Sequence, residues 1–206
     1  MLLQFLDYIG VAVFALTGAI MASRKGLDIL AFLFLATITG IGGGTLRDVL
    51  LDVPVFWTLN DRYLLVCLAM SALMWVAGPQ VEKLGKPLRW ADAIGMAAYC
   101  VMGAAKALAV TDSALVAILL GTMTATFGGI LRDIVVGEKS ALLKPEIYVS
   151  AALAGSALYV GLRMAEMDSW VAAGLAAAFA LILRGGAIVA GWTLPVYKSG
   201  ASLDRP

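Results

Sequence analysis

The stretch Gly43-Gly44-Thr45-Leu46-Arg47-Asp48 returns 85 residues later as Gly128-Gly129-Ile130-Leu131-Arg132-Asp133. The same shift superimposes polar residues outside this motif, pairing Asp7 with Asp92, Thr39 with Thr124, Tyr63 with Tyr148 and Ser71 with Ser156. Matches between acidic, hydroxyl and arginine residues do not arise from a shared apolar alphabet. The chain therefore contains two copies of one unit.

The composition is typical of a protein embedded in a membrane. Hydrophobic residues make up 62% of the 206 residues and charged residues 14%, and the mean hydropathy is +0.93. Soluble domains are about 45–50% apolar and about 25% charged. The apolar stretches are rich in Ala, Leu and Gly and lack a period of two, which favours helices over a barrel. The sequence predicts an all-α integral membrane protein.

Seven apolar stretches approach the roughly 20 residues that cross a bilayer; they cover residues 3–23, 28–46, 62–78, 93–111, 114–131, 147–163 and 170–192. Repeat A (5–78) and repeat B (91–163) hold three stretches each. Because three is odd, the second copy must insert upside down. We predict one membrane domain, residues 1–206. It comprises two inverted three-helix repeats, a cytoplasmic linker at 79–90, a seventh helix at 168–192 and a cytoplasmic tail at 193–206.

The distribution of Lys and Arg predicts the orientation, because cytoplasmic loops carry an excess of both. One side of the expected topology carries Arg24, Lys25, Lys83, Lys86, Arg89, Arg132, Lys139, Lys144, Arg184, Lys198 and Arg205. The other side carries only Arg47, Arg62 and Arg163. The N-terminus is therefore expected outside the cell and the C-terminus in the cytoplasm. The expected location is the inner membrane of a prokaryote.

The glycine clusters Gly40–Gly44 and Gly128-Gly129 fall inside apolar stretches, where each glycine costs about 0.8–1 kcal/mol relative to alanine. One explanation is that they break or kink the second helix of each repeat, so that freed carbonyl groups face a permeating cation. The alternative is that they only allow helices to cross closely. Thr39 and Thr124 precede the clusters. Their hydroxyl groups either face a cation or bond to the carbonyl four residues earlier.

The Arg-Asp pairs lie about one helical turn beyond the glycines, at opposite ends of the expected path. Charged groups in a membrane usually face a cavity or one another. Because adjacent residues on a helix point in different directions, we expect each pair to need partners from other segments. Asp7 and Asp92 are expected as N-caps or first-turn acids.

Two further charges lie in apolar stretches. Lys106 is the candidate gating residue, with snorkelling to the membrane surface as the alternative, and its counterpart in repeat A is Met21. Arg184 is expected to be an anchor. Enzymatic chemistry is disfavoured because the chain has no histidine, no carboxylate cluster and only two cysteines, both inside apolar stretches. The net charge of +1 gives no reason to expect a nucleic-acid partner, and no cofactor or protein partner is indicated.

The doubled Gly-Gly-x-x-Arg-Asp motif, the seven spans and the two three-helix repeats resemble the prokaryotic trimeric intracellular cation (TRIC) channels, a family that also carries a glycine-transporter label. This resemblance implies a homotrimer with one pore in each protomer, kinks at Gly42–Gly44 and at Gly128-Gly129, and permeation of potassium and sodium. Animal relatives gate partly through lysines in the segment that holds Lys106, but their Lys-Glu-Val signature is absent here.

The leading functional prediction is a potassium-permeable channel for monovalent cations. The expected path is lined by Thr39, Gly42, Gly43, Gly44, Arg47, Asp48, Thr124, Gly128, Gly129, Arg132 and Asp133. Cations would bind only transiently, near the paired glycines, and bound lipid is compatible with the sequence. The alternative is a secondary transporter of a small zwitterion such as glycine, since helix termini at a break bind a carboxylate and free carbonyls bind an ammonium group.

Overall fold

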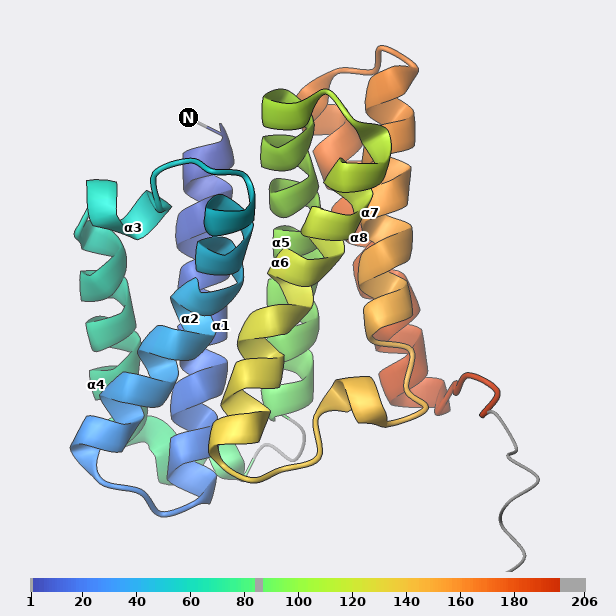
Figure 1. The fold of residues 1–206 in the computed structure, drawn as a ribbon. Coiled ribbons are helices and arrows are strands. Elements are labelled where there is room, and N and C mark those ends of the chain that lie inside the picture. The colour runs from blue at the N-terminus through green and yellow to red at the C-terminus, as the bar shows by residue number, and fades with distance from the viewer. Residues whose placement is uncertain (1, 84–86, 197–206) are drawn as a thin grey trace, which may run out of the picture.

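A computed structural model describes residues 2–83 and 87–196 and shows a helical bundle (Figure 1). Within these ranges the elements are α1 (Leu2–Arg24), α2 (Ile29–Leu50), α3 (Phe56–Leu59), α4 (Arg62–Glu82), α5 (Pro87–Thr111), α6 (Ala114–Val135), the 3-10 helix η1 (Ala141–Leu143), α7 (Val149–Met164) and α8 (Ser169–Ala190). Five of them, α2, α4, α5, α6 and α8, are long and apolar enough to cross a membrane. The all-α membrane class is thus confirmed.

The helices alternate in direction along the chain. In Figure 1, α1 runs downward from the end marked N and α5 runs upward, and their successors α2 and α6 are likewise opposed. We call the end at which α1 begins the upper end and the opposite end the lower end. The last turns of α2 and α6 therefore lie at opposite ends, which places the two Arg-Asp pairs far apart.

Helices α1 and α5 form the centre of the bundle. Helix α1 packs on α2, α4 and α5, whereas α5 packs on α6, α7 and α8. The contact between them repeats with the 85-residue shift: a Cβ added to Gly10 would lie 2.0 Å from the Tyr99 ring, and one added to Gly95 would lie 3.2 Å from the Phe14 ring. Small residues let the two backbones approach, as in other membrane helix pairs.

Polar caps set the starts of the two helices that carry the motif. The Asp28 carboxylate accepts a hydrogen bond from the Ala31 amide at 2.8 Å, and the Ser113 hydroxyl accepts one from the Val116 amide at 3.5 Å. Asp28 and Ser113 are themselves 85 residues apart. Each cap satisfies an amide that the helix leaves without an internal partner.

The connections depart from the expected boundaries in detail. Helix α4 continues to Glu82, through Pro79, and α5 begins at Pro87, so helices occupy most of the expected 79–90 linker. Beyond α8, Thr193 forms a bridge to Glu146 and the Leu194 amide donates to the Pro145 carbonyl at 2.9 Å. Most of the expected tail, residues 197–206, lies outside the described part of the chain.

Candidate functional site

The middle of the bundle is a direct backbone contact between α2 and α6. A Cβ added to Gly43 would lie 2.1 Å from the Thr124 carbonyl oxygen, and one added to Gly128 would lie 2.3 Å from the Thr39 carbonyl oxygen. The two contacts exchange under the 85-residue shift, so each glycine of one repeat receives the threonine backbone of the other. Only glycine fits at this separation.

The predicted helix breaks are not present in this conformation. Helix α2 is continuous from Ile29 to Leu50 and α6 from Ala114 to Val135. An interruption of α2 or α6 at the glycines is therefore not confirmed, the expected kink stays a prediction, and close crossing accounts for Gly43 and Gly128. The physical reason is that backbone contact between helices needs missing side chains but leaves the hydrogen-bond ladder intact.

The remaining motif glycines face side chains. A Cβ on Gly42 would lie 3.0 Å from the Leu131 side chain, and one on Gly44 would lie 2.6 Å from the Phe56 ring. Gly129 makes room for the Tyr148 hydroxyl group, which would lie 3.0 Å from an added Cβ.

The threonine hydroxyl groups bond within their own helices. Thr39 donates to the Leu35 carbonyl and Thr124 donates to the Leu120 carbonyl, each at 2.6 Å. Both side chains are buried. This matches the second of the two roles expected for them, in which the hydroxyl group satisfies the carbonyl four residues earlier.

Arg47 centres a buried network at the upper end. Its Nε donates to Asp48 at 2.7 Å, its Nη1 donates to the Met102 sulfur at 2.9 Å, and its guanidinium lies 5.8 Å from the centre of the Phe56 ring. The other Asp48 oxygen accepts from the Phe56 amide at 2.9 Å. The side chains of Arg47 and Asp48 are fully buried.

Lys106 joins this upper network. Its ammonium group lies 2.8 Å from Asp48, and its side chain is 27% exposed. Lys106 is thus neither free nor snorkelling away from the bundle. It gives Asp48 a second cationic partner, so two positive charges meet one carboxylate in this network.

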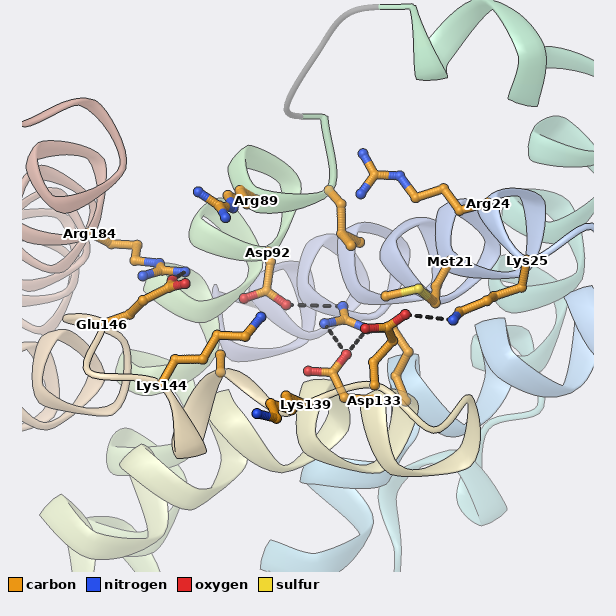
Figure 2. A pocket seen from close by; sticks show the side chains of 14 residues that line it. Met21, Arg24, Lys25, Arg89, Asp92, Asp133, Lys139, Lys144, Glu146 and Arg184 are labelled. Atoms are coloured by element: carbon orange, nitrogen blue, oxygen red, sulfur yellow. Dashed lines mark hydrogen bonds and ion pairs between the residues drawn. The ribbon is translucent and has the colours of Figure 1, made fainter. Parts of the chain in front are cut away.

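Arg132 centres the equivalent network at the lower end. It contacts Asp133, from its Nε at 3.0 Å and from its Nη2 at 2.9 Å. Its Nη1 donates to the Thr17 hydroxyl at 3.0 Å and to Asp92 at 3.1 Å. Figure 2 shows Asp92 and Asp133 turned toward one another across this guanidinium group. The pairing joins α1, α5 and α6.

The partners expected from other segments are present: Lys106 and Met102 at the upper end, and Thr17 and Asp92 at the lower end. The premise that neighbours in sequence cannot pair was wrong, because the long arginine side chain folds back along the helix to the adjacent aspartate. Asp7 and Asp92 are not N-caps either: α1 begins at Leu2 and α5 begins at Pro87, so both carboxylates lie inside helices and are buried.

Four residues of the two networks are not among the site residues predicted from the sequence: Thr17, Asp92, Met102 and Tyr148. A signal was available: Thr17 and Met102 are 85 residues apart, as are Asp7 and Asp92, and Tyr63 and Tyr148. Met102 bonds to Arg47 and Thr17 bonds to Arg132. Arg47 and Arg132 are 85 residues apart, and so are their partners Met102 and Thr17. The 85-residue shift, applied to the neighbours of one arginine, therefore indicates the neighbours of the other.

A cavity of about 360 Å³ opens at the lower end beside Asp92, Arg132 and Asp133 (Figure 2). Its other charged lining residues are Arg24, Lys25, Arg89, Glu138, Lys139, Lys144, Glu146 and Arg184. Lys25 pairs with Glu138 across the mouth, and this bond lowers the pKa of the Glu138 carboxyl group. The cavity is charged and reaches the Arg132 network, so it provides an aqueous approach to Asp133.

Arg184, expected to be an anchor, contacts the segment before α7. It donates to the Ile147 carbonyl at 3.1 Å and to Glu146 at 3.0 Å, and its guanidinium lies 5.0 Å from the centre of the Tyr148 ring. These contacts fasten α8 to the segment before α7. The residue thus supports the lower network from one side.

Comparison with known proteins places the chain in a family. The family model described as "Glycine transporter" matches it twice, at residues 4–79 and 89–164. The UPF0126 membrane protein of Vibrio cholerae is 37% identical over 95% of this chain and 83% of its own length. The UPF0126 inner membrane protein YadS of Escherichia coli is 37% identical over 77% of this chain and 78% of its length.

The fold matches that of a solved channel. The crystal structure of the TRIC trimeric intracellular cation channel orthologue from Rhodobacter sphaeroides superimposes with a TM-score of 0.89 and 39% identity, over 93% of this chain and 99% of that chain. The chain therefore belongs to the family of membrane proteins that the glycine-transporter model describes, together with the UPF0126 proteins and the prokaryotic TRIC channels.

Proposed function

We propose that the protein is a potassium-permeable channel for monovalent cations, with a pore inside each protomer. The observation that carries the proposal is the likeness over nearly the whole chain to a protein described as a trimeric intracellular cation channel. The arrangement of charges supports it, because a carboxylate lies at each end of the α2–α6 crossing, Asp48 above and Asp133 below. Carboxylates at pore mouths concentrate cations.

The proposed path runs from the lower cavity past Asp133 to the α2–α6 crossing and leaves beside Asp48. We take the described conformation to be non-conducting, because the backbones touch at Gly43 and Gly128. Opening then requires α2 and α6 to separate or bend at their glycines, where no side chains interlock. Potassium and sodium would bind there only transiently, to backbone oxygens near Gly44 and Gly129, since fast conduction needs weak sites.

The proposal extends to the membrane topology, the orientation and the assembly of the channel. We propose that α1 and α7 cross the membrane together with α2, α4, α5, α6 and α8, as two inverted repeats and a seventh span. The cavity end, rich in Lys and Arg, would face the cytoplasm, with the N-terminus outside. The membrane would be the inner membrane of a prokaryote, the assembly a homotrimer, and lipid would fill the exposed apolar faces.

The test is reconstitution of the purified full chain into planar bilayers under a potassium gradient. We expect stepwise currents that reverse near the potassium equilibrium potential. Saturable uptake of glycine into liposomes, with no current, would refute the channel and favour the zwitterion transporter.

A variant pair tests the lower mouth. Asp133→Asn should lower the unitary current at low ionic strength, because it removes the charge that concentrates cations there, and less so at high salt, where the field is screened. Glu166→Gln, an exposed acid in the turn between α7 and α8 at the upper end, is the matched control and should conduct like the wild type. Equal currents from Asp133→Asn and the wild type would contradict the proposed path.

A further inference from the structure

The two arginine networks are related by the 85-residue shift, yet they differ in one bond. At the lower end Arg132 Nη1 contacts Asp92 at 3.1 Å. Asp7 is the counterpart of Asp92, and Arg47 is the counterpart of Arg132. At the upper end, however, Arg47 Nη1 bonds to the Met102 sulfur, and within the described part of the chain Asp7 forms no such pair.

Both members of this missing pair hold an unsatisfied atom. Asp7 Oδ1 and Arg47 Nη2 are buried, and neither has a hydrogen-bond partner among the residues that the structure describes. Asp7 is 9% exposed and Arg47 is 1% exposed. Buried polar atoms are nearly always hydrogen-bonded, and buried charges are paired, because desolvation is otherwise uncompensated. Asp7 thus holds an unsatisfied acceptor and Arg47 an unsatisfied donor, and their counterparts Asp92 and Arg132 are bonded to one another. One explanation should account for both unsatisfied atoms.

The packing of α1 on α2 brings the two groups to the same end of the bundle. A Cβ added to Gly40 would lie 3.1 Å from the Val11 carbonyl oxygen, and the two helices run in opposite directions, so Asp7, one turn before Val11, lies beside the last turns of α2, which carry Arg47. The present partner of Arg47 Nη1 is moreover a thioether sulfur, a weak acceptor, where Arg132 has the hydroxyl of Thr17. Arg47 is thus held on that side by a weaker bond than its counterpart.

We propose that Asp7 is a positioning residue for the upper end of the pathway. In a second conformation Arg47 turns from Asp48 and Met102 to Asp7, which reproduces the bond that Arg132 already makes to Asp92. Asp48 then loses one of its two counter-charges and becomes available to a permeating cation. This inference rests on the proposed channel function, which supplies the reason for a second conformation.

The one lysine that breaks the repeat symmetry fits this exchange. Lys106 contacts Asp48 at 2.8 Å, whereas its counterpart Met21 offers no charge to Asp133. When Arg47 leaves, Lys106 still neutralises Asp48, so the exchange leaves no buried carboxylate without a counter-charge. At the lower end, where Arg132 already bridges both aspartates, no lysine is needed.

The first experiment records single channels of Asp7→Asn, which keeps the shape of the side chain and removes its charge. We expect the open probability to fall on the order of tenfold, a typical size for coupling between two sites, with an unchanged unitary current. In an Arg47→Gln background, Asp7→Asn should have no further effect. The matched control is Asp52→Asn, an exposed acid just beyond α2 at the same end, whose φ of 53° asparagine tolerates.

Two results from these recordings would overturn the inference. An unchanged open probability would show that Asp7 takes no part in opening. A reduced unitary current in both backgrounds would show that Asp7 binds permeating cations directly and does not act through Arg47.

The second experiment needs no current and compares thermal unfolding of Asp7→Asn and Asp92→Asn in detergent. Asp7 is unpaired in the described conformation, so Asp7→Asn should melt at the wild-type temperature or above it, whereas Asp92→Asn should melt lower because it breaks a formed ion pair. An equal loss in both variants would mean that Asp7 is already bound to Arg47, directly or through a water molecule, and would overturn the inference. If the wild type carries no cation current, the proposed function fails, and this comparison still decides the state of Asp7.

Discussion

Replacing Gly43 by alanine puts a methyl group into the backbone contact between α2 and α6. The new Cβ would lie 2.1 Å from the Thr124 carbonyl oxygen, and ordinary van der Waals contact begins at 3.4 Å. The two helices must therefore separate locally by about 1.3 Å, because a backbone oxygen cannot rotate away as a side chain can. The same substitution tests whether the crossing at the middle of the bundle is as close as the structure has it.

The size of the effect follows from two opposed contributions. Overpacking costs about 1–3 kcal/mol, and a rigid backbone neighbour calls for the upper part of that range. Alanine gains about 1 kcal/mol over glycine in a helix interior. We therefore expect Gly43→Ala to lower the free energy of unfolding by about 2 kcal/mol.

Matched controls lie on the outer surface of the bundle. Gly161 in α7 and Gly174 in α8 are exposed, and nothing lies within 4 Å of a Cβ added to either. Alanine at these positions should stabilise the protein by about 1 kcal/mol through helix propensity alone. Equilibrium unfolding in mixed micelles, followed by tryptophan fluorescence, measures all three variants. A difference below about 1 kcal/mol between Gly43→Ala and Gly174→Ala would refute the close crossing.

Three further outcomes are expected. Lys106→Gln removes the bond to Asp48 and should shift the open probability on the order of tenfold; an unchanged conductance–voltage relation would leave Lys106 a structural role only. Arg132→Gln leaves two buried carboxylates without their counter-charge and should cost about 3–5 kcal/mol in unfolding experiments, so a loss under about 1 kcal/mol would contradict the network. Asp168→Ala removes the cap that accepts from the Trp170 and Val171 amides, and should cost about 1 kcal/mol, while asparagine should retain most of it.

The class of the protein and its two-fold repetition could be read from the chain. High hydropathy leaves helices as the way to satisfy the backbone in lipid, and the 85-residue shift by itself pairs residues 43 and 128, 47 and 132, and 48 and 133. Those positions occupy equivalent places in the two halves, the glycines at the central crossing and the Arg-Asp pairs at opposite ends, because the contacts of one half exchange with those of the other under the shift.

The role of the glycines could not be read in the same way. A missing side chain is compatible with a broken helix and with a close crossing, and local sequence does not distinguish them. The choice depends on what lies opposite, and for Gly43 and Gly128 that is a threonine backbone in the other repeat. The unbroken helices follow from this contact, which no local pattern encodes.

The partners of the charged residues were also decided by the tertiary structure. The sequence by itself determined that two Arg-Asp pairs occupy equivalent positions of opposed repeats and that one lysine has no counterpart. It did not determine that Arg132 closes onto Asp92 while Arg47 leaves Asp7 unpaired. Identical local sequences reach different partners here because packing of α1 and α5 sets which side chains surround each guanidinium, Thr17 at one end and Met102 at the other.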